Sequence, residues 1–397
     1  MTLRADRGDE QVVVVATGGC GSLAWYSRRL AEATRARTVT LAGCSGSFGH
    51  RLMSAYALKR LRDDVSAVHR LRGHDAPLLH FTSQHLARYA PWLGTRYVVT
   101  VHDLMRHRDW RERGQRSPLI HEPNLRDRLY LRLDAAGLRG ADALIAVSDH
   151  TRREIVELLD IPPARVTVVP EGVDRHAFKP VARSLLSDPY VLYVGSEQPR
   201  KNLATLFRAF MRARRALPNL RLVKLGGPGG AEAPFRDATL AEVRASGALP
   251  HVLFVDWVSH DDLVAWYSGA LCLVHPSRHE GFGLPPLEAM ACGCPVVVST
   301  GGALPDVVAG AGVVYGSPDD ASALAGALER LIATPAERMR FARAGSERAA
   351  AMSWEHTADL TRAVWRDTIA ADAVTSTRRP RWRPRTMIAE RMARRSI

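Results

Sequence analysis

Short apolar runs alternate along the chain with longer amphipathic stretches. The first series is "QVVVVATGG", "RTVTLAG", "APLLHFTS", "RYVVTVHD", "DALIAVSD" and "RVTVVPEG". The second series is "YVLYVGSE", "LRLVKLGG", "HVLFVDWV", "LCLVHPS", "CPVVVST" and "AGVVYGS". Helix-like patterns separate the runs, and regular alternation of strand and helix is typical of parallel sheets. The pattern predicts an α/β protein with two doubly wound, Rossmann-like domains.

A stretch without periodicity, residues 174–189, separates the two series and is interrupted by prolines. We expect an N-terminal domain over residues 1–176 and a C-terminal domain over 188–355. A helix over 356–372 and a basic tail over 373–397 would complete the chain. Two domains also fit the length, since 397 residues exceed what one hydrophobic core usually organises.

The cysteines are few and scattered, at Cys20, Cys44, Cys272, Cys292 and Cys294, which argues against a disulfide framework. A reduced, cytosolic setting fits this usage best. The N-terminal apolar run is too short for the core of a signal peptide, and no run approaches the length of a membrane span. These observations predict a cytoplasmic protein, either soluble or peripheral on the inner face of the membrane.

The formal net charge of +14 first suggests nucleic acid or anionic lipid as a partner. Residues 373–397, however, hold eight arginines and one glutamate, so half of the excess lies in the tail. One interpretation of the tail is a solvated, disordered end. The other is an anchor on an anionic membrane surface, because Trp382 and Ile388 lie among the arginines. We expect no nucleic-acid partner.

Ligands of doubly wound folds bind beyond the carboxyl ends of the strands, so the residues closing each run are the candidates. In the first domain these are Gly18, Gly19, Gly21, His80, His102 and Asp103. In the second they are residues 195–201, Gly226, Gly227 and the stretch "HPSRHEGFGLPPLE", residues 275–288. Two such crevices facing each other would form one cleft.

The first run continues into "GGCGSLAWYS", where Gly19, Gly21 and Ala24 satisfy a dinucleotide-binding fingerprint. An NAD-dependent oxidoreductase is therefore an alternative. That function needs an acid at the end of the second strand to hold the ribose, and "TLAGCSG" has none. The glycines would still allow a ligand to approach the backbone closely.

In the stretch that begins at His275, a buried strand leads through a glycine-rich turn into a helix opened by prolines. Amides near Gly283 and Leu284 would then face outward from a helix N-terminus, which binds phosphate. Glu280 lies before the turn, and Glu288 is placed to accept two ribose hydroxyl groups. The plainer interpretation makes Glu280 a solvated loop acid and Glu288 an acid favoured by the helix dipole.

The spacing of "EGFGLPPLE" resembles the signature of retaining glycosyltransferase family 4, which has the GT-B fold. Five further segments match that family's pattern in order. They are "VTVHDL", "ADALIAVSDHTRREI", "VTVVPEGVD", "YVGSEQPRKNLATLFRAF" and "GGALPDVVAGAGVVY". The resemblance implies that the first domain binds the acceptor, that the second binds the nucleotide sugar, and that the C-terminal helix crosses back to the first domain.

The same resemblance implies a role for each matching residue. Arg200 and Lys201 in "PRKN" would neutralise the donor diphosphate, as a fork and as a point charge. Glu288 would hold the ribose. Glu280 would contact hydroxyl groups of the donor sugar near the anomeric carbon, with His102 on the sugar's other side. A solvated turn is the plainer account of the "RK" pair.

Gly19 and Gly21 would let the first domain close on the phosphates, and Phe282 belongs to the donor-binding turn. The chain departs from the family at two positions. Ser196 stands where many relatives carry an arginine, which leaves the cationic work to Arg200 and Lys201. Asp256 stands where relatives often carry a glycine, near the expected base pocket.

We therefore expect a retaining, metal-independent hexosyltransferase that uses a UDP- or GDP-linked sugar and no cofactor. Mannose is a candidate sugar, and a glycan or a lipid-linked molecule is the expected acceptor. No cluster has metal-ligand spacing, and "HDLMRH" is explained by Asp103 capping a helix with His107 on the surface. The alternatives are an epimerase, a phosphorylase or another GT-B enzyme, and a non-catalytic nucleotide-sugar binding protein.

Overall fold

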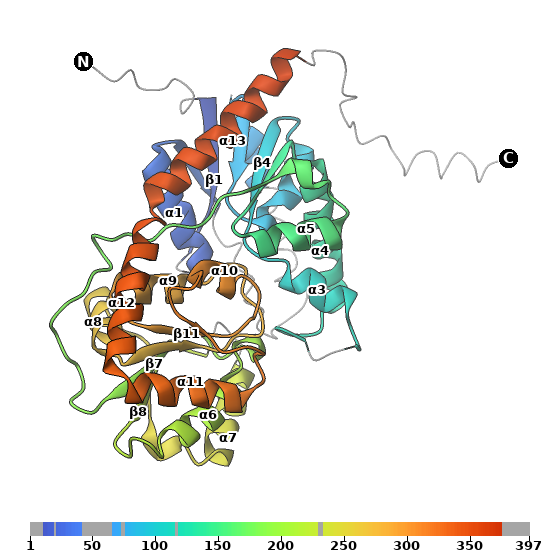
Figure 1. The fold of residues 1–397 in the computed structure, drawn as a ribbon. Helices are drawn as coiled ribbons and strands as arrows, with labels where there is room; N and C mark the ends of the chain where they lie inside the picture. Colours follow the sequence, from blue (N-terminus) through green and yellow to red (C-terminus); the bar gives the residue numbers. More distant parts are fainter. Residues whose placement is uncertain are drawn as a thin grey trace, which may run out of the picture.

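The computed structural model describes residues 11–19, 21–41, 66–72, 76–115, 118–228 and 233–374. Figure 1 shows two α/β halves that follow one another along the chain and meet near the middle of the molecule. The candidate membrane anchor in the tail lies outside the described residues from position 375 onward.

The first half is built on a six-stranded parallel sheet of order β2-β1-β3-β4-β5-β6. Its strands are β1 (Val12–Thr17), β2 (Arg37–Leu41), β3 (Leu78–Phe81), β4 (Arg96–Val101), β5 (Ala143–Ala146) and β6 (Val166–Val168). Its α-helices include α1 (Ser22–Thr34), α3 (Met105–Arg111), α4 (Leu125–Gly140) and α5 (Asp149–Leu159). Two 3-10 helices span Gln84–Trp92 and Pro163–Arg165.

The second half repeats the design with a six-stranded parallel sheet of order β12-β11-β10-β7-β8-β9. The strands are β7 (Tyr190–Val194), β8 (Arg221–Leu225), β9 (Val252–Val255), β10 (Cys272–His275), β11 (Val296–Val298) and β12 (Val313–Val314). The helices are α6 (Leu203–Ala213), α7 (Ala233–Ala245), α8 (His260–Gly269), α9 (Leu284–Ala291), α10 (Leu304–Val308), α11 (Ala321–Ala333) and α12 (Pro335–Ala350). Two 3-10 helices span Pro199–Lys201 and Leu249–His251.

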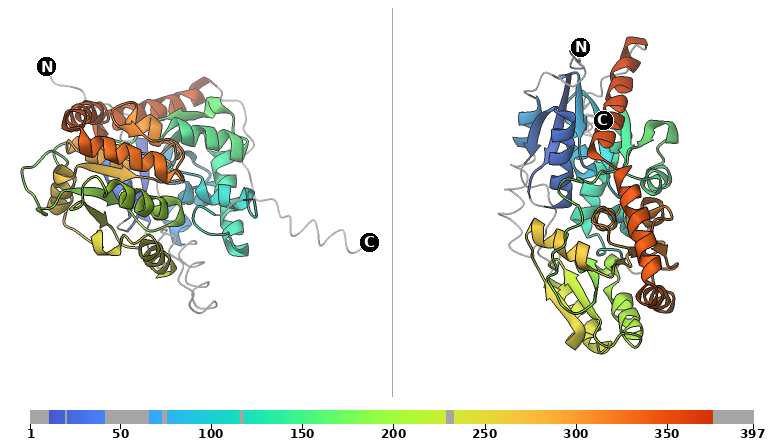
Figure 2. Two further views of the ribbon diagram at one scale, coloured as in Figure 1. Left: turned by 60° about the horizontal axis from the view of Figure 1, so that its bottom comes forward. Right: turned by 60° about the vertical axis from the view of Figure 1, so that its left-hand side comes forward.

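Every apolar run singled out in the sequence forms one of these strands, so the predicted fold class is confirmed. Residues 12–15 of β1 and 296–298 of β11 are fully buried, as expected for strands covered by helices on both faces. Figure 2 shows helices on both sides of each sheet. Among the described residues, no helix combines the length and the apolar character that a membrane span requires.

The last helix, α13 (Trp354–Val374), leaves the second half and lies along the first (Figure 1). It packs against α1 and β5. The side chain of Trp365 is buried among residues of the first sheet, and its Nε1 donates a 3.1 Å hydrogen bond to Nδ1 of His80 on β3. The last helix of the described chain therefore packs on the first half, together with β1 and α1 from the beginning of the chain.

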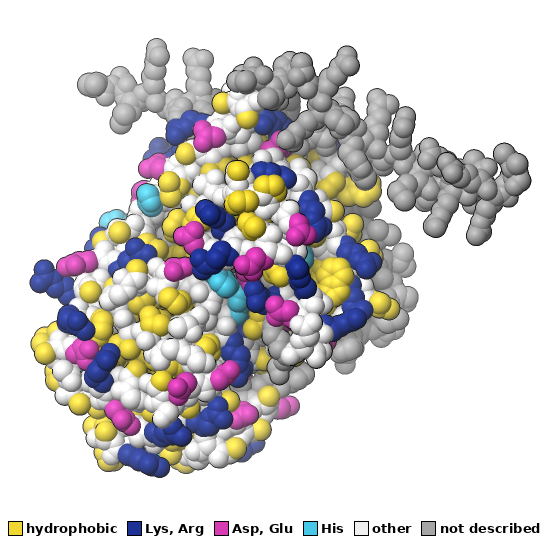
Figure 3. All heavy atoms as spheres, turned by 45° about the vertical axis from the view of Figure 1, so that its right-hand side comes forward, with side chains coloured by type: hydrophobic (Ala, Val, Ile, Leu, Met, Phe, Trp, Pro, Cys, Tyr) yellow, Lys and Arg dark blue, Asp and Glu magenta, His cyan; other side chains and the backbone are white. Residues whose placement is uncertain are grey.

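The surface does not carry a single sign of charge. Figure 3 shows basic and acidic side chains interspersed over one face of the molecule. Such a surface offers no continuous basic stripe of the kind that tracks a nucleic-acid backbone. The face in Figure 3 therefore gives no support to nucleic acid as a partner.

Candidate active site

The candidate residues of the second half lie between β7 and β10, where the strand order of the parallel sheet reverses. β7 and β10 are neighbouring parallel strands, with Cys272 paired to Val191. The chain leaves β7 to the 3-10 helix Pro199–Lys201, and it leaves β10 to the turn before α9. Both segments therefore meet at one edge of the sheet, at the switch point where doubly wound folds bind ligands.

The centre of this edge is the carboxylate of Glu280, which collects three nitrogen atoms. Lys201 Nζ lies 2.7 Å from its Oε1, and Arg200 Nη1 lies 2.8 Å from its Oε2. His275 Nε2 lies 3.0 Å from Oε1. The side chains of Lys201 and Glu280 are 8% and 10% exposed, so Glu280 is not a solvated loop acid and Lys201 is not on a solvated turn.

Burial and charge act against each other on these groups. Burial alone would raise the pKa of Glu280, but the charges of Arg200 and Lys201 and the hydrogen bond with His275 hold it well below its usual range. Burial and the neighbouring Arg200 charge lower the pKa of Lys201 to about 8, although Glu280 opposes the change. Arg200, Lys201 and Glu280 thus amount to two cations and one anion at neutral pH, which leaves this cluster net positive.

The turn before α9 has the conformation that its glycine allows. Gly283 has φ 126°, a region that side-chain-bearing residues avoid, and it precedes the helix Leu284–Ala291 with prolines in the first turn. The predicted helix start and glycine stop are both found, since Gly293 follows the helix with φ 72°. The side chain of Phe282 is buried in the core of the second half and anchors the turn there.

Glu288 lies one turn into α9 and is partly exposed. Its Oε2 accepts a 2.8 Å hydrogen bond from the hydroxyl of Tyr267 on α8, which is fully buried. Desolvation raises the pKa of Glu288 to about 7, despite the hydrogen bond from Tyr267. The carboxyl group is therefore poised between its two protonation states near neutral pH.

His102 follows β4 in the first half, and both of its ring nitrogens have hydrogen-bond partners within the protein. Nδ1 lies 2.7 Å from Oε1 of Glu171, and Nε2 lies 3.0 Å from the carbonyl oxygen of Thr82. Burial disfavours the charged ring, yet the hydrogen bond and charge of Glu171 raise the pKa of His102. The contact with Glu171 thus favours the protonated ring, and sequence reasoning did not predict it.

The polar residues that follow His102 have structural roles. Asp103 Oδ1 accepts a 3.2 Å hydrogen bond from the amide of Met105 at the start of α3. His107 is buried, with Nε2 3.2 Å from the carbonyl oxygen of Leu131, so the expectation of a surface histidine is wrong. The burial comes from tertiary packing, because α3 contacts both α4 and α5.

Gly19 and Gly21 lie between β1 and α1. Gly19 has φ 110°, and no atom lies within 4 Å of the place that a Cβ would take at either glycine. A cavity of about 310 Å³ borders Gly19, and its lining combines apolar surface with the polar side chains of Thr17, Arg28 and Thr40. Among the described residues, nothing therefore obstructs the approach of a ligand to the backbone at these two glycines.

A second charged cluster lies at the carboxyl ends of β7, β8 and β9, next to Ser196. Arg236 on α7 pairs with Glu197 at 2.8 Å and with Asp256 at 2.5 Å, and Lys224 Nζ lies 2.5 Å from Glu197. The sequence singled out Asp256 but missed the others. The available signal was Lys224 inside the apolar run "LRLVKLGG", because a lysine buried in a strand needs a carboxylate partner.

The two halves touch directly beside Glu280. Ser148 Oγ donates a 2.6 Å hydrogen bond to the carbonyl oxygen of Gly281, and Thr151 Oγ1 lies 3.2 Å from the same atom. A Cβ on Gly281 would lie only 1.8 Å from the carbonyl oxygen of His102. The contact brings candidate residues of both halves to one place, and sequence reasoning did not identify Ser148 and Thr151 as its donors.

Comparisons with known proteins agree with this geometry. Residues 5–177 match the family model described as Glycosyltransferase Family 4, and residues 174–348 match Glycosyl transferases group 1. A D-inositol 3-phosphate glycosyltransferase of Kineococcus radiotolerans is 36% identical over 251 residues, covering 58% of each chain. One from Mycobacterium tuberculosis is 35% identical over 241 residues, covering 58% of this chain and 49% of the relative. The match thus spans about half the length of these relatives.

Solved structures show the same architecture over nearly the whole chain. Sucrose-phosphate synthase from Thermosynechococcus elongatus has a TM-score of 0.73 and 25% identity, covering 91% of this chain and 100% of that one. Anabaena HepE in complex with UDP-glucose has a TM-score of 0.70 and 15% identity, covering 91% and 99%. Together, the two family models and the two facing α/β halves show that the chain belongs to the glycosyltransferases of family 4 with the GT-B fold.

Proposed function

We propose that the protein transfers a hexose from a nucleoside diphosphate sugar to an acceptor hydroxyl group with retention of the anomeric configuration. The observation that carries the proposal is the buried, net positive cluster of Arg200, Lys201 and Glu280 at the switch point of the second sheet. The N-terminus of α9 adds backbone donors at the same edge. A diphosphate is negatively charged and would therefore complement this net positive cluster.

In this proposal Arg200 and Lys201 bind the diphosphate, while Glu280 fixes both cations and reaches the hydroxyl groups of the sugar. Two ion pairs already orient the cations before the donor arrives, so little reorganisation is needed at the moment of reaction. Glu288 accepts the ribose hydroxyl groups with the oxygen that Tyr267 leaves available. Main-chain amides at Gly283 and Leu284 face the phosphate oxygens.

The chemistry is electrostatic. Breaking the bond between the anomeric carbon and the diphosphate leaves positive charge on the sugar and negative charge on the leaving group. Fixed cations and helix amides stabilise that negative charge, and removing one such donor typically costs about 10²–10³ in turnover. The acceptor oxygen then bonds to the anomeric carbon from the leaving-group face, and its proton passes to a phosphate oxygen. This course needs no metal ion at the diphosphate.

His102 acts as a positioning residue in this proposal rather than through a ring nitrogen. Its ring is fixed by Glu171 and Thr82, and its carbonyl oxygen contacts Gly281 beside the reacting sugar. Gly19 and Gly21 lie on the side of the first half that faces the donor in this proposal, and the cavity next to Gly19 offers an acceptor the side chains of Thr17, Arg28 and Thr40.

The donor is a UDP- or GDP-linked hexose, and mannose remains one sugar to test. Support for a UDP-linked donor comes from Anabaena HepE, whose structure holds UDP-glucose. Support for a polyol-phosphate acceptor comes from the names of the curated relatives, D-inositol 3-phosphate glycosyltransferases. A glycan or lipid-linked acceptor is the alternative. We also propose that the tail, residues 373–397, holds the protein to an anionic membrane surface.

A thermal-shift screen of nucleotide sugars in excess EDTA tests the donor site before any acceptor is known. We expect at least one UDP- or GDP-hexose to raise the melting temperature. We expect no such rise with Arg200→Ala, because that variant lacks one of the two cations that bind the diphosphate. Stabilisation that requires an added divalent ion would contradict a metal-independent donor site.

A further inference from the structure

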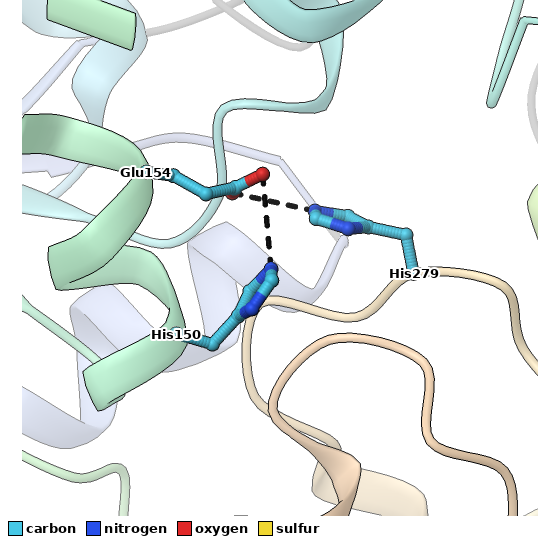
Figure 4. A group of neighbouring side chains, drawn as sticks. All are labelled: His150, Glu154 and His279. Carbon is cyan, nitrogen blue, oxygen red and sulfur yellow. Dashed lines mark ion pairs between the residues drawn. The ribbon is translucent and has the colours of Figure 1, made fainter. Parts of the chain in front are cut away.

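Three metal-binding side chains from the two halves converge beside the candidate active site (Figure 4). His150 and Glu154 lie on α5 of the first half, four residues apart and therefore on one face of the helix. His279 comes from the turn between β10 and α9 of the second half, directly before Glu280. Figure 4 shows all three side chains directed toward a common point.

The candidate ligand atoms lie close enough together to share one cation. His279 Nε2 lies 3.4 Å from Oε2 of Glu154, and His150 Nε2 lies 3.7 Å from Oε1. All the ligand atoms of the group lie within 4.8 Å of one another. Bonds of about 2.0–2.1 Å at tetrahedral angles place neighbouring ligand atoms about 3.4 Å apart. Small side-chain adjustments would complete such a geometry.

The same atoms lack hydrogen-bond partners among the described residues. Nε2 of His150, Oε2 of Glu154 and Nε2 of His279 are all buried without one. Glu154 is 1% exposed and His279 is 5% exposed. The histidines meet Glu154 only in ion pairs of 3.4 and 3.7 Å, which are longer than a good hydrogen bond, so a shared partner between the three side chains would contact each more closely. A cation satisfies all three at once.

The other contacts of these side chains hold them in place and leave the space between them accessible to an ion. Arg108 Nε donates a 3.0 Å hydrogen bond to Oε1 of Glu154, which leaves Oε2 directed at His279. The rings of His150 and His279 pack edge to face with centroids 4.9 Å apart. Contacts that hold a ligating carboxylate in place are usual around metal sites.

We propose that His150, Glu154 and His279 bind a divalent transition-metal ion of the Zn²⁺ class and so cross-link the two halves. Imidazole nitrogens select such ions over Mg²⁺ and Ca²⁺, which prefer oxygen ligands. Three protein ligands leave one position for water. The carbonyl oxygen of His279 accepts a 3.2 Å hydrogen bond from Arg200, so the ion also fixes the main chain next to Glu280. The search for ligand spacing in the sequence missed the site because His279 lies far from α5.

Metal binding to the full-length protein, first stripped with a chelator, tests the proposal without any activity assay. We expect one Zn²⁺ per chain by calorimetry at this site, with visible Co²⁺ absorption bands of tetrahedral intensity. Zn²⁺ should also raise the melting temperature by mass action. Loss of one ligand should weaken Zn²⁺ binding by more than about 100-fold, since changing even a residue that only holds a ligand in place costs about 10–100-fold.

His150→Ala and His279→Ala remove ligands from opposite halves, so a folding defect in one does not leave the question open. Circular dichroism verifies the fold of each. His356→Ala changes an exposed histidine of α13 and should retain the wild-type Co²⁺ spectrum. Undiminished Zn²⁺ and Co²⁺ binding by the His150→Ala/His279→Ala double variant would overturn the proposal, as would the absence of binding to the wild type. Donor stabilisation in EDTA is a separate measurement, so the two proposals can fail independently.

Discussion

The main chain of Gly281 lies against the carbonyl oxygen of His102, so closely that a Cβ at Gly281 would stand 1.8 Å from that oxygen. The two residues belong to different halves of the molecule, and Gly281 directly follows Glu280. Only a residue without a side chain permits this approach. The contact therefore sets how closely the candidate residues of the two halves come together.

Gly281→Ala should separate the halves at this point, because a clash with backbone cannot be relieved by a rotamer change. We expect a loss of about 1–3 kcal/mol in unfolding free energy, the usual cost of overpacking, together with reduced turnover. Chemical denaturation measures the first effect. Gly326→Ala on α11 is the matched control, since nothing lies within 4 Å of its Cβ position. A Gly281→Ala protein as stable and active as the wild type would refute the role of this contact.

Replacing the two glutamates that flank the turn before α9 should have different effects on the enzyme. Glu288→Ala should weaken nucleotide binding, because it is assigned to the ribose. Glu280→Ala should mainly lower turnover, by about 10²–10³, since it orients both cations and contacts the reacting sugar. Calorimetry and steady-state kinetics separate the two effects. Glu329→Ala, an exposed acid of α11, should change neither. Equal binding losses with unchanged turnover would contradict the assignment.

Donor affinity should depend on pH on both sides of neutrality. Glu288 has a pKa of about 7 because of desolvation, so below that value it is protonated and accepts ribose hydroxyl groups poorly. Burial lowers the pKa of Lys201 to about 8, so above that value the diphosphate loses one cation. Affinity for a nucleotide sugar, whose diphosphate does not titrate in this range, should therefore be highest between these values.

Two variants identify the groups behind the pH profile. Glu288→Gln should flatten the acidic side, because the amide does not titrate. Lys201→Arg should flatten the alkaline side, because the guanidinium stays charged. Calorimetric titrations across the pH range give the profiles. If donor affinity still falls at both acidic and alkaline pH in both variants, other groups control the affinity.

The basic tail gives a prediction that is independent of the donor site. The full-length protein should sediment with anionic vesicles at low salt, since each arginine near such a surface contributes about 1 kcal/mol. A full-length variant with glutamine in place of the eight arginines of residues 373–397 should not sediment and should still bind donor. Equal sedimentation of the two proteins would show that the tail is not an anchor.

The sequence was a good guide to the strands and a weaker one to the contacts between side chains. Buried parallel strands need β-branched runs, so each run became a strand, and the switch point placed Arg200, Lys201 and Glu280 together. The pairing of His102 with Glu171 could not be predicted, because it joins positions 69 residues apart. The convergence of His279 on α5 likewise depends on how the two halves meet.

The most direct test of the central claim is release of nucleoside diphosphate from the stabilising nucleotide sugar, followed with and without candidate acceptors. We predict release by the wild type, with the sugar product keeping the anomeric configuration of the donor in nuclear magnetic resonance spectra. An Arg200→Ala/Lys201→Ala variant should release about 10²-fold less or lower still. If the wild type binds the donor but releases no nucleoside diphosphate to any acceptor or to water, the protein is a binding protein and the account is wrong.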